Sequence, residues 1–156
     1  MKIKTCSRCN GAGTVSNQHV LHCGVPGGCY KCDMAGKVVT LTMAERVLVF
    51  IASSERGLIE WTKTANEIKE RAQANHDRIV ASYVSSGMTP RQREVLSDWD
   101  QRQLADLRQC YISTKKAIAA VRVSNKVTAQ QCQVTFPMSS LSYLKKIVGA
   151  AEVVAA

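Results

Sequence analysis

The sequence has few aromatic residues and no long apolar segment. Its 156 residues include only two Trp, four Tyr and two Phe, although 46% of the chain is hydrophobic. A core must therefore be built mainly from Leu, Ile, Val and Ala, which suits packed helices better than a β-sandwich. The apolar run Val47–Ala52 is far too short to cross a bilayer, so we expect no association with a membrane.

Motifs of the common catalytic sites are missing as well. The chain contains no Gly-x-Ser-x-Gly elbow, no phosphate-binding loop and no His-Glu-x-x-His helix. His76 and Asp77 are neighbours in a helical stretch, where adjacent side chains point in different directions, so they do not predict a catalytic dyad. We therefore expect a protein that is not an enzyme.

No charged segment followed by an apolar one opens the chain, so we expect the protein to stay in a reducing compartment, the cytoplasm. Seven cysteines are present, an odd number that does not favour a disulfide framework. Two of them, Cys110 and Cys132, stand alone in apolar or mixed surroundings, and we expect both to be buried as small apolar residues.

Two Cys-x-x-Cys hooks are the most specific pattern in the chain. The first reads Cys-Ser-Arg-Cys-Asn-Gly-Ala-Gly over residues 6–13, and the second reads Cys-Tyr-Lys-Cys-Asp-Met-Ala-Gly over residues 29–36. Four thiolates complete a closed tetrahedral shell around zinc, so one structural zinc ion is expected, and its binding would fold the segment. The predicted ligands are Cys6, Cys9, Cys29 and Cys32.

Other potential zinc ligands lie in the loop between the hooks. They are His19, His22 and Cys23, and replacement of a favoured cysteine by one of them stays open. The paired spacing of the hooks favours the four cysteines. A redox role for the hooks is less favoured, because a thioredoxin-like motif requires a strand-to-helix context that neither hook has.

The first hook matches the CxxCxGxG unit of DnaJ-type chaperones, and residues 6–36 resemble the cysteine-rich zinc finger of that family, with Met34 in place of one glycine. The family carries four such units and a His-Pro-Asp signature, whereas this chain has two units and no such signature, so a co-chaperone role does not follow. The same segment is similar to the stand-alone zinc finger of small bacteriophage proteins. That resemblance implies phage origin and a bacterial host cell.

Basic residues outnumber acidic ones by nine, which favours polyanionic partners such as nucleic acid. The finger contributes five basic residues against one acid, Asp33. The predicted phosphate-contacting residues are Lys2, Lys4, Arg8, Lys31 and Lys37, with Arg91 and Arg93 from the region beyond the finger.

Beyond the finger, the β-branched stretch Lys37–Thr42 predicts a short strand. Thr42 and Glu45 form a capping box, so a helix should begin at about Met43. This helix either breaks near Ser53 to Gly57 or continues without interruption.

Apolar residues at spacings of three, four and seven predict a long antiparallel helical hairpin, with helices over about 58–86 and 90–122. The turn is marked by Ser85-Ser-Gly-Met-Thr89, and Thr89-Pro-Arg-Gln92 is typical of a helix start. The first seam comprises Trp61, Ala65, Ile68, Ala72, Ile79 and Tyr83. The second comprises Leu96, Trp99, Gln103, Leu107, Cys110, Thr114, Ile118 and Val121.

After a short strand or extended return over residues 125–136, a last helix is expected at about 139–149. The sequence thus predicts a mainly α fold: a zinc finger with short β elements over residues 1–41, and a helical domain over residues 42–156.

Two functions follow from these features. The first is a zinc-binding accessory or regulatory protein that binds nucleic acid through phosphate contacts. The alternative is a module that binds a host protein through the hairpin and inhibits or redirects it, for example in transcription or defence. Unpaired heptad faces also allow a homo-oligomer.

Overall fold

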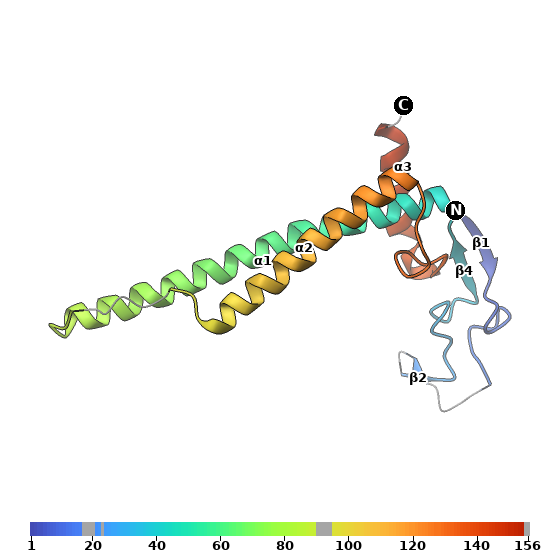
Figure 1. Cartoon of the computed structure of the whole chain (residues 1–156). Helices are drawn as coiled ribbons and strands as arrows, with labels where there is room; N and C mark the ends of the chain where they lie inside the picture. The colour runs from blue at the N-terminus through green and yellow to red at the C-terminus, as the bar shows by residue number, and fades with distance from the viewer. Residues whose placement is uncertain (17–20, 23, 90–94, 155–156) are drawn as a thin grey trace. The chain divides into compact units, whose positions relative to one another are not determined.

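The computed structural model describes residues 1–16, 21–22, 24–89 and 95–154, and it is mainly α-helical with short strands (Figure 1). This confirms the predicted fold class. The helices in the described residues are α1 (Met43–Ser85), α2 (Asp98–Ser124), the short 3-10 helix η1 (Met138–Ser140) and α3 (Leu141–Val154). The strands are β1 (Lys2–Thr5), β2 (Leu21–His22), β3 (Val25–Pro26), β4 (Lys37–Thr40) and β5 (Thr135–Pro137).

The chain forms two compact units. Unit 1 comprises Met1–Ser53 together with Ala120–Ala156, and unit 2 comprises Ser54–Ala119. Unit 1 therefore joins the two ends of the chain, with the strands, the cysteine hooks and α3, whereas unit 2 contains the greater part of α1 and α2. The predicted domain boundary after residue 41 stays a prediction, since a compact unit is not the same thing as an independently folding domain.

The strands β1, β4 and β5 form an antiparallel sheet with β4 in the centre. Successive side chains of a strand point to opposite faces of the sheet, and two neighbouring valines of β4 use this alternation. Val39 packs into the main aliphatic core and pairs in register with Phe136, whereas Val38 packs against the cysteine cluster. The sheet thus has a different core on each face.

The larger core of unit 1 consists of aliphatic residues from both ends of the chain, as the scarcity of aromatic residues predicted. Its buried members are Val39, Leu41, Val47, Val49, Val121, Val127, Cys132, Leu144 and Val148. Cys132 is buried as expected, whereas the same expectation for Cys110 is wrong, because that residue is exposed on α2. Among the described residues, no helix combines the length and apolarity needed to cross a bilayer.

A buried arginine in the first turn of α1 donates hydrogen bonds to the segment that follows α2. Arg46 is only 7% exposed, and its guanidinium donates hydrogen bonds to the carbonyl oxygens of Thr128 (2.9 Å) and Cys132 (3.1 Å). These carbonyls belong to a single turn that is closed by a hydrogen bond from the Cys132 amide to the Thr128 carbonyl (3.1 Å). The rigid fork of arginine suits this pair of acceptors, whereas the single ammonium of lysine does not.

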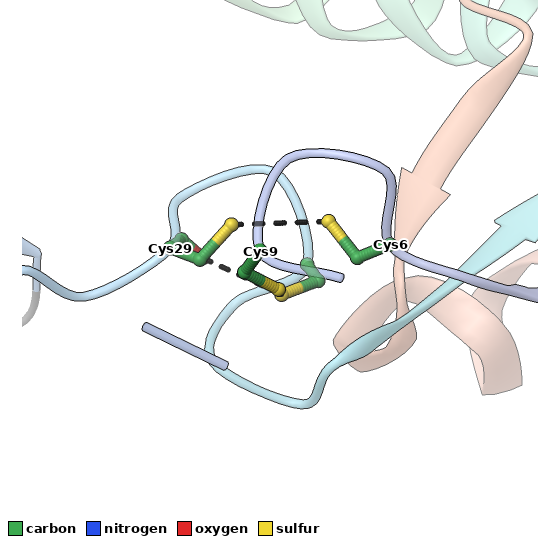
Figure 2. A group of neighbouring side chains, drawn as sticks. Cys6, Cys9 and Cys29 are labelled. Atoms are coloured by element: carbon green, nitrogen blue, oxygen red, sulfur yellow. Dashed lines mark hydrogen bonds between the residues drawn. The ribbon is translucent and has the colours of Figure 1, made fainter. Parts of the chain in front are cut away.

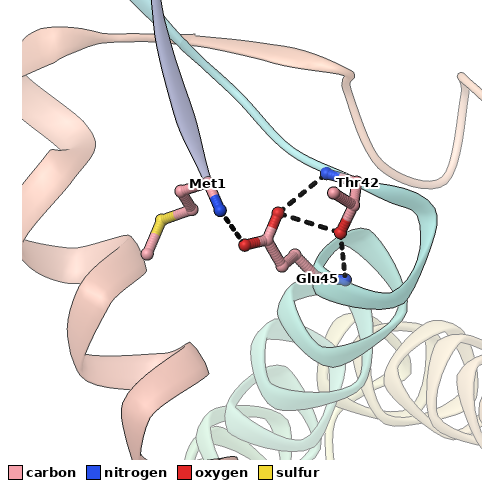
Figure 3. A network of polar contacts seen from close by, with 3 residues as sticks. All are labelled: Met1, Thr42 and Glu45. Atoms are coloured by element: carbon pink, nitrogen blue, oxygen red, sulfur yellow. Dashed lines mark hydrogen bonds and ion pairs between the residues drawn. The ribbon is translucent and has the colours of Figure 1, made fainter.

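The predicted capping box begins α1 (Figure 3). The Glu45 amide donates to the Thr42 hydroxyl (3.3 Å), and the Glu45 carboxylate accepts from the amide (2.8 Å) and hydroxyl (2.9 Å) of Thr42. The amino group of Met1 also contacts this carboxylate. Burial disfavours ionisation of Glu45, but the bonds from Met1 and Thr42 prevail and lower the pKa of this carboxyl group.

In unit 2, α1 and α2 form the predicted helical hairpin. Helix α1 continues without a break through residues 53–57, which was one of the two predicted alternatives. It ends as the sequence predicted: Gly87 has a φ of +70°, and the Met88 amide bonds back to the Tyr83 carbonyl (3.0 Å).

The predicted start of the second helix at residue 90 is wrong, because α2 begins at Asp98 and residues 95–97 are not helical. Ser97 caps the helix instead: its hydroxyl accepts from the Asp100 amide (3.1 Å) and donates to the Asp100 carboxylate (2.7 Å). Arg71 of α1 donates to the same carboxylate (2.9 Å). The predicted cap Thr89 is followed by residues 90–94, which lie outside the described part of the chain.

The helical seam is confirmed at most positions but not at Ile79, Trp99 and Cys110, which are exposed. Ile68 and Ala72 of α1 and Ile118 of α2 are buried, whereas Trp99 is 66% exposed. The neighbouring Asp100 is partly buried instead, and its carboxylate forms an ion pair with Arg71 of α1.

The last predicted helix is longer than expected at its C-terminal end, since α3 runs over Leu141–Val154 after the single turn of η1. Its apolar side is the predicted one, with Leu144 and Val148 buried and Lys145 and Lys146 exposed.

Replacing Arg46 by Met should lower the free energy of unfolding by about 2–4 kcal/mol, because the buried bond to the Cys132 carbonyl and the partly buried bond to the Thr128 carbonyl lose their charged donor. Urea denaturation followed by circular dichroism measures this change. The matched control Arg56→Met removes an exposed arginine from the same helix and should change stability by less than about 0.5 kcal/mol. Equal effects of the two substitutions would show that Arg46 has no special structural role.

Candidate metal centre

The four predicted cysteines meet in unit 1. All four side chains are buried, and their sulfur atoms lie within 4.8 Å of one another. The Sγ atoms of Cys6 and Cys29 are 3.8 Å apart, and those of Cys9 and Cys32 are 3.6 Å apart; Figure 2 shows Cys6 and Cys29 pointing toward each other. A tetrahedral zinc site with bonds of about 2.3 Å has sulfur–sulfur edges of about 3.8 Å. The donor set therefore fits one metal ion.

The two hooks are joined by a reciprocal exchange of backbone hydrogen bonds. The Cys6 amide donates to the Gly36 carbonyl and the Cys29 amide donates to the Gly13 carbonyl, both over 2.9 Å. Residues 6 and 29, like residues 13 and 36, are separated by 23 positions. The two hooks are therefore equivalent at an offset of 23 residues, and the first residue of each hook donates a hydrogen bond to the last residue of the other.

The final glycine of each hook lies against the backbone of the other hook. A Cβ atom on Gly13 would come within 2.3 Å of the Met34 carbonyl oxygen, and one on Gly36 within 2.1 Å of the Gly11 carbonyl oxygen. Both glycines also have positive φ, +78° and +68°. No side chain fits at either position, which explains why these two glycines accompany the cysteines.

Met34 stands where the first hook has Gly11, and it keeps the conformation of that glycine. Its φ is +60°, in the left-handed region that favours glycine, and the φ of Gly11 is +90°. The departure from the CxxCxGxG pattern therefore changes the residue but not the turn. The local strain at Met34 is offset by the hydrogen bond from its amide to the Cys29 carbonyl (3.1 Å).

Two of the thiols differ in acidity. Burial disfavours ionisation of Cys9, but the amides of Gly13 and Gly11 and the neighbouring thiols bring its pKa down to about 7. Burial and the nearby thiols of Cys29 and Cys9 raise the pKa of Cys32 to about 12. A metal ion binds thiolates, so it must displace the protons from this cluster, and metal affinity should fall as the pH is lowered.

His22, one of the rival ligands, is engaged elsewhere. Its Nε2 atom lies 2.9 Å from Oδ1 of Asp33, and hydrogen bonds from His22 and Ser139 lower the pKa of Asp33. The other two rivals, His19 and Cys23, lie outside the described residues. The described part of the chain thus favours the four-cysteine set.

The predicted phosphate-contacting residues are spread over several surfaces. Lys2 and Lys4 share one face of β1, and their cross-strand neighbours are Thr40 and Val38. Lys37 pairs with Thr5 and lies on the opposite face.

The remaining basic residues fall into two groups. Arg8 and Lys31 lie inside the hooks, where they contact Tyr30 and Ser7. Arg91 and Arg93 lie outside the described residues.

The pairing of the hooks was missed by sequence reasoning. The 23-residue offset between matching Cys, Ala and Gly positions was a signal for it, because equivalent turns are able to exchange equivalent hydrogen bonds.

Comparisons with protein families, curated proteins and solved structures found no match to this chain. The assignment of the metal centre therefore depends on the geometry of the cysteines.

Replacing Cys29 by Ser should abolish metal binding, because three thiolates do not complete the shell. Elemental analysis of the purified protein should give one zinc per wild-type chain and none for the variant. Most of the helical circular dichroism should remain, since more than half of the helical residues lie in unit 2. The control Cys110→Ser changes an exposed cysteine outside the cluster and should keep the metal.

Replacing Gly36 by Ala should weaken metal binding strongly, because the new Cβ would overlap the Gly11 carbonyl and separate the hooks. The control is Gly24→Ala. Gly24 also has a positive φ, +77°, but a Cβ atom there would have no other atom within 4 Å. This control should cost only about 1–2 kcal/mol of stability and keep the metal. Competition with a chromogenic chelator measures the affinity, and equal losses would argue against the glycine contact.

Proposed function

We propose that this is a zinc-binding accessory or regulatory protein that binds nucleic acid through phosphate contacts made by unit 1. The proposal treats the metal as zinc with a structural role, because four thiolates leave no open coordination position for a substrate. It accordingly assigns no catalytic residue. The resemblance of residues 6–36 to phage zinc fingers supports a role in the reducing cytoplasm of a bacterial host, where the thiols stay available for the metal.

The uneven distribution of charge is the main support for nucleic-acid binding. Unit 1 contains ten Lys and Arg against three Asp and Glu, an excess of seven, whereas unit 2 contains eleven against nine. Four thiolates on a zinc ion carry a net charge of minus two, so the metal-loaded unit 1 keeps an excess of about five. Most of the net positive charge therefore belongs to the unit that holds the four cysteines.

The acidic side chains described in unit 1 already have partners. Asp33 accepts from His22, and Glu45 accepts from Thr42 and the Met1 amino group. By contrast, Lys2 and Lys4 are exposed on β1, an edge strand of the sheet. Their face of the sheet is also the face of Val38, which packs against the cysteine cluster. The exposed lysines and the metal centre are thus on one side of the sheet.

The test is fluorescence anisotropy of labelled DNA and RNA, single- and double-stranded, with zinc-loaded protein at about 0.05 and 0.2 M salt. We expect binding at the lower salt that weakens steeply at the higher salt. The double variant Lys2→Glu/Lys4→Glu should weaken binding more than tenfold and reduce the salt slope by about two.

The matched control for that variant is Lys69→Glu/Lys116→Glu, which makes the same charge change on exposed lysines of unit 2. It should have little effect. No binding by wild-type protein at the lower salt, or equal losses in both variants, would contradict the proposal.

A second function, binding of a host protein through the hairpin, is supported by the apolar surface of unit 2. Ile59 is 69% exposed and Trp99 is 66% exposed. A groove of about 580 Å³ also lies between α1 and α2, lined in part by Ile68, Leu107 and Cys110. A protein partner retained at 0.2 M salt by wild-type protein, but lost with Trp99→Ser, would favour this function.

A further inference from the structure

The residues between the cysteines of the two hooks meet at one exposed tip. Lys31 Nζ donates to the Ser7 hydroxyl over 3.0 Å, and Arg8 Nη1 donates to the Tyr30 hydroxyl over 2.7 Å. The Arg8 guanidinium carbon also lies 4.2 Å from the centre of the Tyr30 ring. We call these four residues the knuckle tip.

The knuckle tip follows from the pairing of the hooks. At the 23-residue offset, Ser7 corresponds to Tyr30 and Arg8 corresponds to Lys31. The contact between Ser7 and Lys31 is therefore the counterpart of the contact between Tyr30 and Arg8. Because both contacts join the hooks, a metal ion that holds the four cysteines together also holds the tip together.

Tyr30 presents an exposed aromatic ring in a chain that has only eight aromatic residues. It is 55% exposed although Arg8 covers one face of its ring. The exposed area must then lie on the other face and the edge. Arg8 also restrains the ring through its hydrogen bond, so a ligand that stacks on the open face meets an ordered partner.

We propose that the knuckle tip binds single-stranded nucleic acid, with a base stacked on the open face of Tyr30 and the flanking phosphates near Arg8 and Lys31. An aromatic ring beside basic side chains is the combination that single-strand binders use, since every base offers a stacking face. Bases of a duplex are already stacked on one another, so a duplex gains less from this site. This inference deepens the proposed function and rests on it.

Charge compensation alone would also place cations here. Arg8 and Lys31 lie close to a cluster that carries two negative charges when zinc is bound. That role requires the cations but not an exposed aromatic ring. Substitution of Tyr30, which leaves both cations in place, separates the two explanations.

The experiment compares two labelled ligands, an oligothymidylate and an abasic strand with the same number of phosphates, by anisotropy with zinc-loaded protein. Removing an aromatic platform typically weakens binding about 5- to 150-fold per stacked base. Tyr30→Ala should lose this factor with oligothymidylate and change little with the abasic strand. Tyr30→Phe keeps the ring and should stay within about threefold of wild type.

Two controls guard against a folding effect. Tyr30→Ala should keep one zinc per chain, and Tyr143→Ala, which removes an exposed tyrosine elsewhere in unit 1, should bind as wild type does. Photocrosslinking with an oligonucleotide that carries iodouridine gives a second measurement on unaltered protein. The crosslinked peptide should contain Tyr30.

The outcomes distinguish the inference from the proposed function. If wild-type protein binds neither ligand and no duplex, both fail together. If it binds the two ligands equally and Tyr30→Ala changes neither affinity, phosphate binding stands and the stacking site is refuted. Preferential binding of a duplex, or a crosslink away from the knuckle tip, would also overturn the stacking site.

Discussion

The reciprocal pairing of the two cysteine hooks is the constraint on which the rest of unit 1 depends. Each hook begins with an amide that donates to the last glycine of the other, over 2.9 Å in both cases. The two glycines approach the opposite backbone so closely that no side chain fits. This contact brings four sulfur atoms within 4.8 Å of one another, and it also places the residues between the cysteines at a common tip. The metal centre and the proposed binding surface are therefore products of one interaction.

Strand β4 connects this small centre to the larger core. Its neighbouring residues Val38 and Val39 point to opposite faces, one toward the cysteines and one toward the aliphatic cluster. The cysteine cluster and the core formed with the C-terminal part of the chain thus share one strand. The first hook follows β1 directly and the second hook ends directly before β4, so the hooks are continuous with two paired strands of the sheet. The predicted finger, residues 1–41, therefore contributes Val39 and Leu41 to a core that also contains residues from the C-terminal part of the chain.

Local chemistry explains which sequence predictions were confirmed. The capping box of Thr42 and Glu45 and the helix end at Gly87 depend on residues within a single turn, and both are present. The four cysteines were predicted because their spacing follows from the geometry of a hook. The predicted start of the second helix was wrong because it relied on the local signal at Thr89. The observed cap is Ser97, and its partner Asp100 forms an ion pair with Arg71. That ion pair joins residues 29 positions apart, beyond the range of a local pattern.

The sequence by itself determined the helical class, the donor set for one metal ion and the basic character of the chain. These properties depend on residue type and on spacing within short segments, so they do not require contacts between distant parts of the chain. Only the tertiary structure decided that the hooks pair reciprocally, that Arg46 bonds to carbonyls more than 80 residues away and that Tyr30 lies open beside Arg8. It also assigned most of the charge excess to one unit. The physical reason is that burial and long-range hydrogen bonds arise from the packing of segments that are remote in the chain, and residue spacing alone does not encode that packing.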